Sequence, residues 1–142
     1  MLTADSEDGR VAILGSDKWG IQSGTPESIK GYSSVSTSWH GIYVHNNDGS
    51  LVAWGRNDRG QLPPSNMFQP RSLAVGSEHV IAVSDSSKLV ACGWGEHGNC
   101  GPETDAQGNV AGRWADIPLD LIQGKSVVAV GGGCATSWVV IR

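Results

Sequence analysis

The sequence predicts an all-β protein built from β-propeller repeats, with about three blades in its 142 residues. A segment recurs at a spacing close to 40 residues, which is the usual length of one four-stranded blade. Twenty glycines and six prolines make the chain rich in turns, as short connected strands require. The apolar stretches are rich in Val, Ile, Thr and Trp, which favour strands over helices.

The first half of the repeat is a turn followed by an apolar strand and a glycine. Residues 48–55 (DGSLVAWG) realign with 86–93 (SSKLVACG) at a shift of 38 (93 − 55) and with 8–15 (DGRVAILG) at a shift of 40 (55 − 15). The pair Asp48-Gly49 is a strong hairpin signal, and the apolar run 51–54 that follows predicts a buried strand.

The second half of the repeat lies between copies of the first. Residues 74–83 (AVGSEHVIAV) match 35–44 (VSTSWHGIYV) at a shift of 39 (79 − 40), which pairs His40 with His79 and Trp39 with Glu78. The pattern returns more loosely at 129–140, where Gly131–Gly133 align with the turn at Gly76. Each half supplies two short strands, which gives the four strands of a propeller blade.

These repeats set the expected domain organisation, a single partial propeller over residues 1–142. The last interval, about 55 residues, is longer than the others, so we expect an inserted surface loop with Trp114 and residues 117–122 packed back onto a blade. Closed propellers have four to eight blades, which suggests the C-terminal portion of a longer propeller. The expected segments are a half repeat at about 7–24, repeats at about 33–64 and 72–102, the insertion at about 103–124 and a half repeat at about 125–142.

Composition and charge argue against several kinds of binding partner. The net charge is −4 and no cluster of Lys or Arg forms a basic stripe, which argues against direct binding of nucleic acid. The chain has three cysteines, a small and odd number, whereas a disulfide framework needs an even number. This count indicates reduced thiols, as in proteins of the cytoplasm or nucleus. No signal-peptide pattern and no apolar run of ~20 residues is present, so we expect no membrane partner.

Comparison of equivalent repeat positions identifies tryptophans that are expected at the surface. Trp39 aligns with Glu78, Trp94 with Arg56, and Trp19 with Arg59 and His97. A tryptophan is predicted to be exposed where another repeat has a charged side chain at the equivalent position. Exposed tryptophans are frequent at the centre of protein interfaces. Trp54 aligns with Leu14 and Cys92, and Trp138 lies in an apolar strand, so both are predicted to be core. The predicted partner-binding residues are Trp39, Trp94 and His97, with Trp19 as a weaker candidate.

Other patterns that resemble reactive sites have simpler structural explanations. His40 and His79 share one repeat position, and catalytic bases are rarely duplicated, so a hydrogen bond within the blade is the preferred interpretation. Cys92, His97, Cys100 and Cys134 match no common zinc-finger spacing. Gly131–Gly133 lack the Lys-Ser/Thr of a phosphate-binding loop, and Glu96-His97 has no accompanying nucleophile. We therefore predict no catalytic residue, no metal and no cofactor.

The repeat resembles a known family. Residues 54–62 (WGRNDRGQL), preceded by Asp48-Gly49 and followed by 75–79 (VGSEH), are similar to the repeat of the regulator of chromosome condensation family. That resemblance implies a seven-bladed propeller, of which about three blades would be present here. The family's founding member is a guanine-nucleotide exchange factor for a small GTPase, so the resemblance also leaves this activity open.

A narrower likeness lies toward the C-terminus. Residues 93–102 (GWGEHGNCGP) and 132–141 (GGCATSWVVI) are similar to the fungal alpha-tubulin suppressor group of this family. That resemblance implies a cofactor-free scaffold that binds the zinc-containing diphthamide-synthesis protein and supports diphthamide formation and Elongator-dependent modification of the tRNA wobble uridine. A third interpretation is a partial chain without an independent fold.

Overall fold

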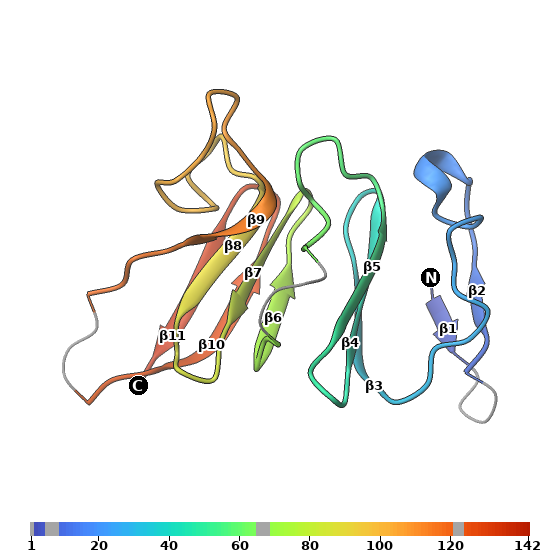
Figure 1. The fold of residues 1–142 in the computed structure, drawn as a ribbon, viewed down its shortest axis with the longest axis horizontal. Helices are drawn as coiled ribbons and strands as arrows, with labels where there is room; N and C mark the ends of the chain where they lie inside the picture. Colours follow the sequence, from blue (N-terminus) through green and yellow to red (C-terminus); the bar gives the residue numbers. More distant parts are fainter. Residues whose placement is uncertain (1, 5–8, 65–68, 121–123) are drawn as a thin grey trace.

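The computed structural model describes residues 2–4, 9–64, 69–120 and 124–142. These residues form eleven β-strands in four antiparallel sheets, with one short 3-10 helix. The sheets stand side by side in a row (Figure 1), and each packs on its neighbours. The prediction of an all-β partial propeller is confirmed. Within the described ranges, no helix has the length and apolar character needed to cross a membrane.

The first two sheets come from the N-terminal part of the chain. Sheet 1 pairs β1 (Leu2–Ala4) with β2 (Val11–Ile13), and the 3-10 helix η1 (Lys18–Gly20) follows. Sheet 2 has the order β3 (Tyr32–Thr37), β4 (Gly41–Asn46) and β5 (Leu51–Gly55). The predicted hairpin turn joins β4 to β5, where Gly49 has a φ of 82° and the Asp48 carboxylate accepts a hydrogen bond from the Ser50 amide at 2.9 Å.

Sheet 3 is a complete four-stranded blade. Its order is β6 (Ser72–Val75), β7 (His79–Val83), β8 (Leu89–Trp94) and β9 (Asn109–Asp116). Sheet 4 pairs β10 (Val127–Gly132) with β11 (Ser137–Ile141). Strand β9 lies inside the segment predicted to be an inserted surface loop, so the loop prediction is wrong for residues 109–116. The expectation that Trp114 packs back onto a blade agrees with its position in the core. The side chains of Val110 and Trp114 are buried, which holds this segment against β8.

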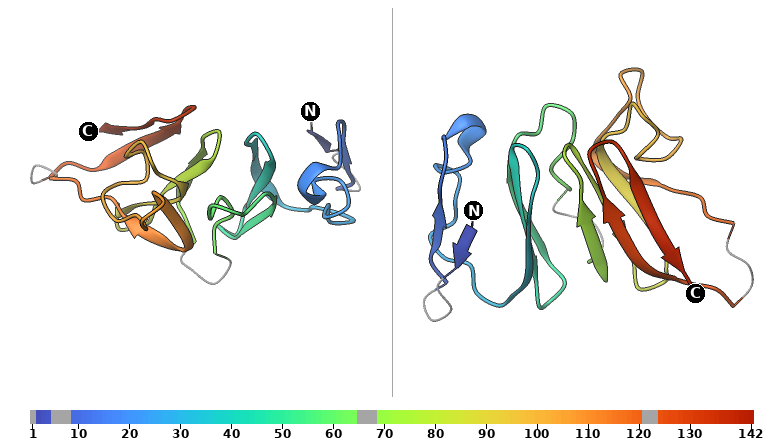
Figure 2. Two further views of the ribbon diagram at one scale, coloured as in Figure 1. Left: turned by 90° about the horizontal axis from the view of Figure 1, so that it is seen from above. Right: turned by 180° about the vertical axis from the view of Figure 1, so that it is seen from behind.

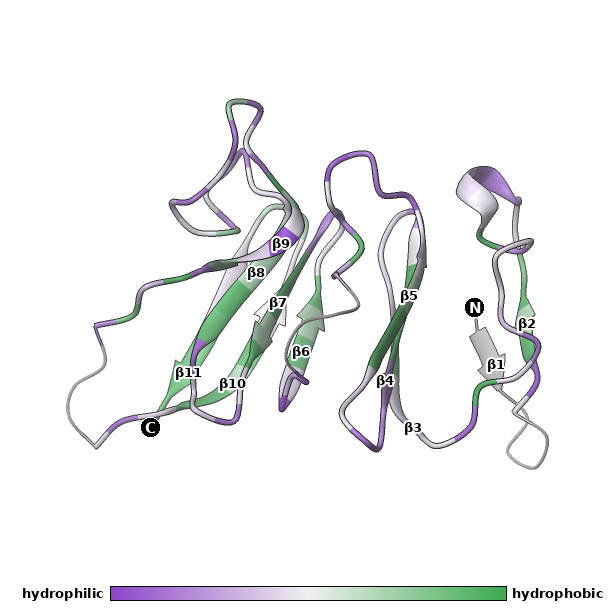
Figure 3. Cartoon of the chain, in the orientation of Figure 1, coloured by the Kyte–Doolittle hydropathy of each residue, from purple (hydrophilic) through white to green (hydrophobic). Residues whose placement is uncertain are grey.

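The hydrophobic core consists of three clusters, one for each pair of neighbouring sheets. On β7, Val80 and Ala82 pack with Tyr43 of sheet 2, whereas Ile81 and Val83 belong to the cluster that contains Val127 of sheet 4. Alternate residues of one strand point to opposite faces, so β7 contributes to the interfaces with both neighbouring sheets. Hydrophobic residues are concentrated in the strands and polar ones in the loops (Figure 3), as blade-by-blade packing requires.

Strand pairing corrects the alignment of the second half-repeat by one residue. Gly41 pairs with Gly55 and His79 pairs with Gly93, which gives a shift of 38 (79 − 41 and 93 − 55). His40 is therefore equivalent to Glu78, and Trp39 to Ser77. The alignment of His40 with His79 was wrong. Shifting the two sequences by one residue still matches apolar residues with apolar residues, but it does not match the hydrogen-bonded register of the strands.

The two tryptophans predicted to be core have different environments. Trp54 is 8% exposed, packs with Ile42 between sheets 1 and 2, and donates from its indole nitrogen to the Ile21 carbonyl at 2.9 Å. Trp138 is 54% exposed, so its prediction as a core residue was wrong. It lies on the face of β11 opposite Val139, which packs against sheet 3.

Candidate functional site

The loops and turns that connect the strands at one end of the sheets form a continuous edge, which we call the loop edge. It comprises residues 15–24, 38–41, 55–62, 76–79, 93–101 and 133–136, and lies at the top of Figure 1. Trp19, Trp39, Trp94 and His97, the four predicted partner-binding residues, all belong to these segments. The structure therefore brings residues from three different repeats to the same edge.

Equivalent turns on neighbouring sheets are joined by backbone hydrogen bonds along this edge. The Trp39 amide donates to the Ser77 carbonyl at 3.2 Å, and the Ser77 amide donates to the Gly133 carbonyl at 3.0 Å. With its backbone fixed in this way, Trp39 presents a side chain that is 65% exposed. The exposure of Trp39 agrees with the prediction, although that prediction aligned Trp39 with Glu78 and the structurally equivalent residue is Ser77.

A recurring glycine positions the residues that follow β5 and β8. Gly55 has a φ of 119°, and a Cβ atom there would lie 2.2 Å from the His40 carbonyl oxygen. The close approach lets the Arg56 amide donate to that carbonyl at 2.7 Å. The Trp94 amide makes the equivalent bond to the Glu78 carbonyl at 2.9 Å. The first residue of each loop is thereby tied to the preceding turn of its own sheet.

Two arginines from sheet 2 contact the tryptophans of the sheets on either side. The Arg56 guanidinium lies 5.2 Å from the ring centre of Trp19, and that of Arg59 lies 4.5 Å from the ring centre of Trp94. Both distances are within the range of a cation–π interaction. Trp94 also contacts His97 edge-on, with ring centres 5.3 Å apart. The arginines thus connect three sheets along the loop edge.

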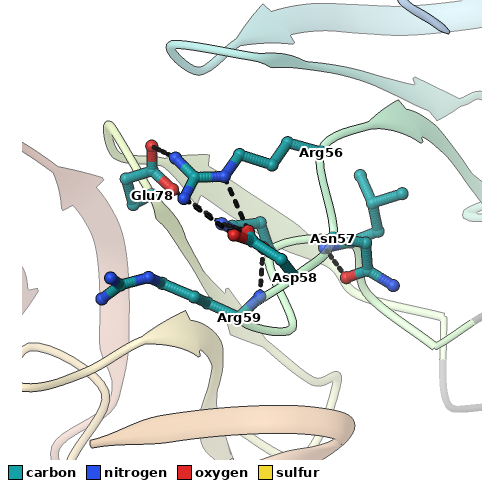
Figure 4. A network of polar contacts seen from close by, with 7 residues as sticks. Arg56, Asn57, Asp58, Arg59 and Glu78 are labelled. Carbon is teal, nitrogen blue, oxygen red and sulfur yellow. Dashed lines mark hydrogen bonds and ion pairs between the residues drawn. The ribbon is translucent and has the colours of Figure 1, made fainter. Parts of the chain in front are cut away.

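Arg56 is also at the centre of a polar network (Figure 4). Its guanidinium donates to the Asp58 carboxylate at 2.6 and 2.9 Å and to Glu78 at 3.0 Å, and the Gln61 amide donates to Glu78 at 2.7 Å. The hydrogen bond from Arg56 lowers the pKa of Asp58 to about 2. Glu78 is only 4% exposed, so the expectation that a charged repeat position marks the surface was wrong.

His79 is the buried histidine of sheet 3, and it links that sheet to sheet 4. Its Nε2 lies 2.9 Å from the Ser137 hydroxyl, which donates its own proton to the Asn99 carbonyl at 2.7 Å. Nε2 must therefore carry the proton that it shares with Ser137. Burial lowers the pKa of His79, which favours this neutral form. The structural role predicted for His79 is consistent with these contacts.

The residues that resembled a zinc site are not gathered in one place. Cys92 and Cys100 are buried, whereas Cys134 and His97 are exposed. Burial raises the pKa of the Cys100 thiol to about 12 and that of Cys92 well above its usual value. In the described part of the chain, no group of three or more His, Cys, Asp or Glu side chains is placed to hold a metal ion.

A polar groove beside the loop edge was not predicted from the sequence. It has a volume of about 670 Å³ and lies between the loop after β5 and residues 95–109, with Arg59, Glu96 and Asp105 among its lining residues. It exists because β9 returns to pair with β8, which brings the intervening loop back toward Arg59. No local sequence signal indicated this return, because the extra residues interrupted the repeat.

Comparisons with known proteins agree with this architecture. No family model matches the chain. An RCC1 repeat-containing protein of Schizosaccharomyces pombe is 29% identical over 148 residues, which cover 96% of this chain and 39% of that protein. The secretion-regulating guanine nucleotide exchange factor of Mus musculus is 28% identical, over 78% of this chain and 29% of that protein.

Solved structures support the same fold. Prp20p of Saccharomyces cerevisiae superposes with a TM-score of 0.63 and 19% identity, covering 72% of this chain and 29% of that one. The chain is similar to RCC1 repeat proteins in sequence and in fold. Human WBSCR16 superposes with a TM-score of 0.64 and 16% identity, covering 96% of this chain and 41% of that one. This RCC1-like chain thus spans less than half the length of the relatives it matches.

Proposed function

We propose that this RCC1-like chain is a non-catalytic scaffold whose loop edge binds another protein. The observation that carries the proposal is the placement of Trp19, Trp39, Trp94 and His97 on one edge, with Trp39 65% and Trp19 45% exposed. Large aromatic side chains are costly to leave in water and often supply the dominant contacts of protein interfaces. The arginine contacts to Trp19 and Trp94 hold two of these rings in place, which lowers the entropy lost on binding.

The proposed partner follows from the likeness to the fungal alpha-tubulin suppressor group. We propose the zinc-containing diphthamide-synthesis protein, with the pair supporting diphthamide formation and Elongator-dependent modification of the tRNA wobble uridine in the cytoplasm and nucleus. The segments that carry this likeness, 93–102 and 132–141, include part of the loop edge. Trp94 and His97 lie in the first of them.

The test measures affinity for that partner by isothermal titration calorimetry. Replacing Trp39 by Ala should weaken binding by about 2 kcal/mol, or roughly thirtyfold, if Trp39 is a dominant contact. The melting temperature should change little, because the side chain is exposed in the unbound chain. Tyr32→Ala is a matched control, since Tyr32 is also partly exposed but begins β3 at the opposite end of the sheet.

Three results would contradict parts of this proposal. Absence of binding by the parent chain would exclude the named partner. An equal loss of affinity in Tyr32→Ala would exclude the loop edge as the specific site. A large fall in stability with unchanged affinity in Trp39→Ala would make Trp39 a structural residue rather than a binding residue.

The second candidate function is guanine-nucleotide exchange on a small GTPase. It is favoured by the likeness to a mouse protein that is named as a secretion-regulating guanine nucleotide exchange factor. An exchange factor accelerates release of bound nucleotide, so a fluorescent-nucleotide release assay with candidate GTPases distinguishes the two functions. Acceleration that Trp39→Ala leaves intact would favour exchange through a surface other than the one proposed for the scaffold.

A further inference from the structure

The polar groove beside the loop edge carries an excess of negative charge. Asp58, Glu96 and Asp105 contribute three carboxylates to its lining, and Arg59 contributes one guanidinium. Asp58 is already in an ion pair with Arg56, at 2.6 Å. Glu96 and Asp105 are in no ion pair among the residues that the structure describes. The unbalanced charge of the groove therefore comes from these two residues.

Arg59 is directed toward an aromatic ring rather than toward these two carboxylates. Its side chain extends away from Asp58 (Figure 4), and its guanidinium lies over the Trp94 ring, 4.5 Å from the ring centre. Trp94 is partly exposed at the end of β8, and its indole nitrogen donates to Glu96 at 3.0 Å. An aromatic surface thus lies beside the acidic side chain of Glu96.

The two unpaired carboxylates are held in place by the surrounding chain. Asp105 accepts hydrogen bonds from two backbone amides of its own turn, at 2.9 and 2.7 Å, and both bonds use the same oxygen, Oδ1. The bond from Trp94 uses only Oε2 of Glu96. Gly108 packs directly against Glu96, since a Cβ atom at Gly108 would lie 2.7 Å from the Glu96 Cα atom. This fixed arrangement lowers the entropy lost when a ligand binds.

A third acceptor in the groove lacks a hydrogen-bond donor. The side-chain oxygen Oδ1 of Asn109 is buried and has no partner in the part of the chain that the structure describes. Asn109 is also one of the lining residues. Buried polar groups are nearly always paired, so an unpaired acceptor indicates a donor that comes from outside. The groove thus presents three acceptor groups, two of them charged, to a ligand that carries donors and positive charge.

We propose that this groove binds a basic segment of another protein, with an arginine or lysine side chain accepted by Glu96 and Asp105. Guanidinium and ammonium groups are positively charged and only donate hydrogen bonds, so they complement a groove of acceptors. The volume of about 670 Å³ is sufficient for such a side chain. The net charge of −4 favours the approach of a basic partner. The ring of Trp94 offers apolar contact to the residues beside the basic one, which favours a protein segment over a free amine.

The groove lies within the row of sheets rather than at either end of it. Its walls come from the loop after β5 in sheet 2 and from residues 95–109 of sheet 3, and these two sheets stand between sheets 1 and 4 (Figure 1). The groove includes neither Trp19 nor Trp39. The proposal therefore goes beyond the function proposed above and can be tested separately from it.

Nuclear magnetic resonance titration of the isotope-labelled chain tests the site with two synthetic peptides. The basic probe is acetyl-Gly-Arg-Leu-Arg-Gly-amide, and the matched control has glutamate in place of both arginines. The basic peptide should shift the amide resonances of residues 58–59, 95–96 and 104–109, whereas the acidic peptide should leave them unchanged. Raising the NaCl concentration from about 50 to about 300 mM should weaken binding of the basic peptide, because salt screens the attraction between exposed charges.

Charge-neutralising variants identify the residues that bind the peptide. Glu96→Gln combined with Asp105→Asn removes both charges but keeps an oxygen acceptor at each position, and it should raise the Kd of the basic peptide about fivefold. Glu96→Gln alone should raise it about twofold and leaves the turn at Asp105 unaltered. Glu103→Gln is the matched control, because Glu103 lies close by in sequence but is not a lining residue, and it should change the Kd by less than about twofold.

Four results would overturn the proposal. The first is an absence of shifts with the basic peptide, and the second is an equal response to the acidic peptide. The third is an equal loss of affinity in Glu103→Gln and in the double variant. The fourth is a set of shifts spread over acidic residues throughout the chain, which would indicate unspecific attraction by the net charge.

Discussion

Glu78 shows that the fold can bury a charge when the chain supplies its partners. It lies in a turn of the loop edge, yet Arg56 and Gln61 satisfy its carboxylate oxygens at 3.0 and 2.7 Å. Arg56 extends from sheet 2 to this residue of sheet 3, so the ion pair also joins two blades. A charged residue at a repeat position therefore does not by itself predict exposure. Whether polar partners lie within hydrogen-bonding distance is the better predictor.

Glu78→Ala should lower the free energy of unfolding by about 2–3 kcal/mol, because it leaves the amide of buried Gln61 without one acceptor and removes a mostly buried ion pair. Arg56 retains Asp58, which limits the loss. Urea denaturation measures the change. Glu103→Ala is the matched control, since its ion pair with Arg113 is solvent-exposed and should contribute under about 1 kcal/mol. Equal losses in both variants would contradict the importance of burial.

At the scale of elements, β9 converts three strands into a complete blade. Among the residues that the structure describes, sheet 2 has no such outer strand, and Val52 of its last strand β5 is 40% exposed. In sheet 3 the equivalent residue Val90 (90 − 52 = 38) is 3% exposed, because β9 and its side chains cover β8. The extra residues that interrupt the sequence repeat therefore complete the best-buried sheet of the molecule.

The contribution of β9 can be measured at Trp114, which is 8% exposed and belongs to the cluster between sheets 2 and 3. Trp114→Ala should lower the free energy of unfolding by about 3–5 kcal/mol, as for other buried tryptophans. Trp39→Ala removes the same side chain from an exposed position and should cost less than about 0.5 kcal/mol. Similar small losses in the two variants, measured by denaturant unfolding, would mean that residues 109–116 do not pack as a blade strand.

At the scale of the whole molecule, stability depends on contacts between successive sheets. Strands β7 and β8 have neighbouring strands on both edges, and their residues are buried except for Trp94 at the end of β8. Strand β11 has one neighbouring strand and an uncovered face. In stacked repeats each unit is stabilised by its neighbours, so the central sheet should be the most resistant to opening and the end sheets the least.

Hydrogen exchange measured by mass spectrometry should follow this order. Amides of β7 and β8 should exchange most slowly, and those of β2 and β11 at least tenfold faster, because opening of an end sheet breaks only one interface between sheets. Uniform protection across all four sheets would instead indicate a single cooperative unit.

Much of the architecture followed from the sequence, and the errors have specific causes. The Asp48-Gly49 turn and the apolar runs were sufficient to locate β4, β5, β7 and β8, because period-two patterns and turn chemistry are local. The one-residue error at His40 arose because both registers place apolar residues in the strand. Strand β9 was missed because it has no counterpart in the other repeats. Trp138 was assigned to the core because an apolar strand does not reveal whether its outer face is covered.

The sequence by itself determined the positions of β4, β5, β7 and β8, the Asp48-Gly49 turn and the alternation of side chains along these strands, since these depend on neighbours along the chain. Only the tertiary structure decided which equivalent positions are buried. Tyr43, Ile81 and Trp138 share one position, and Leu14, Trp54 and Cys92 share another, yet their exposure ranges from zero to 74%. The physical reason is that burial in a stack of sheets depends on whether another sheet is present on that side, which no single repeat encodes.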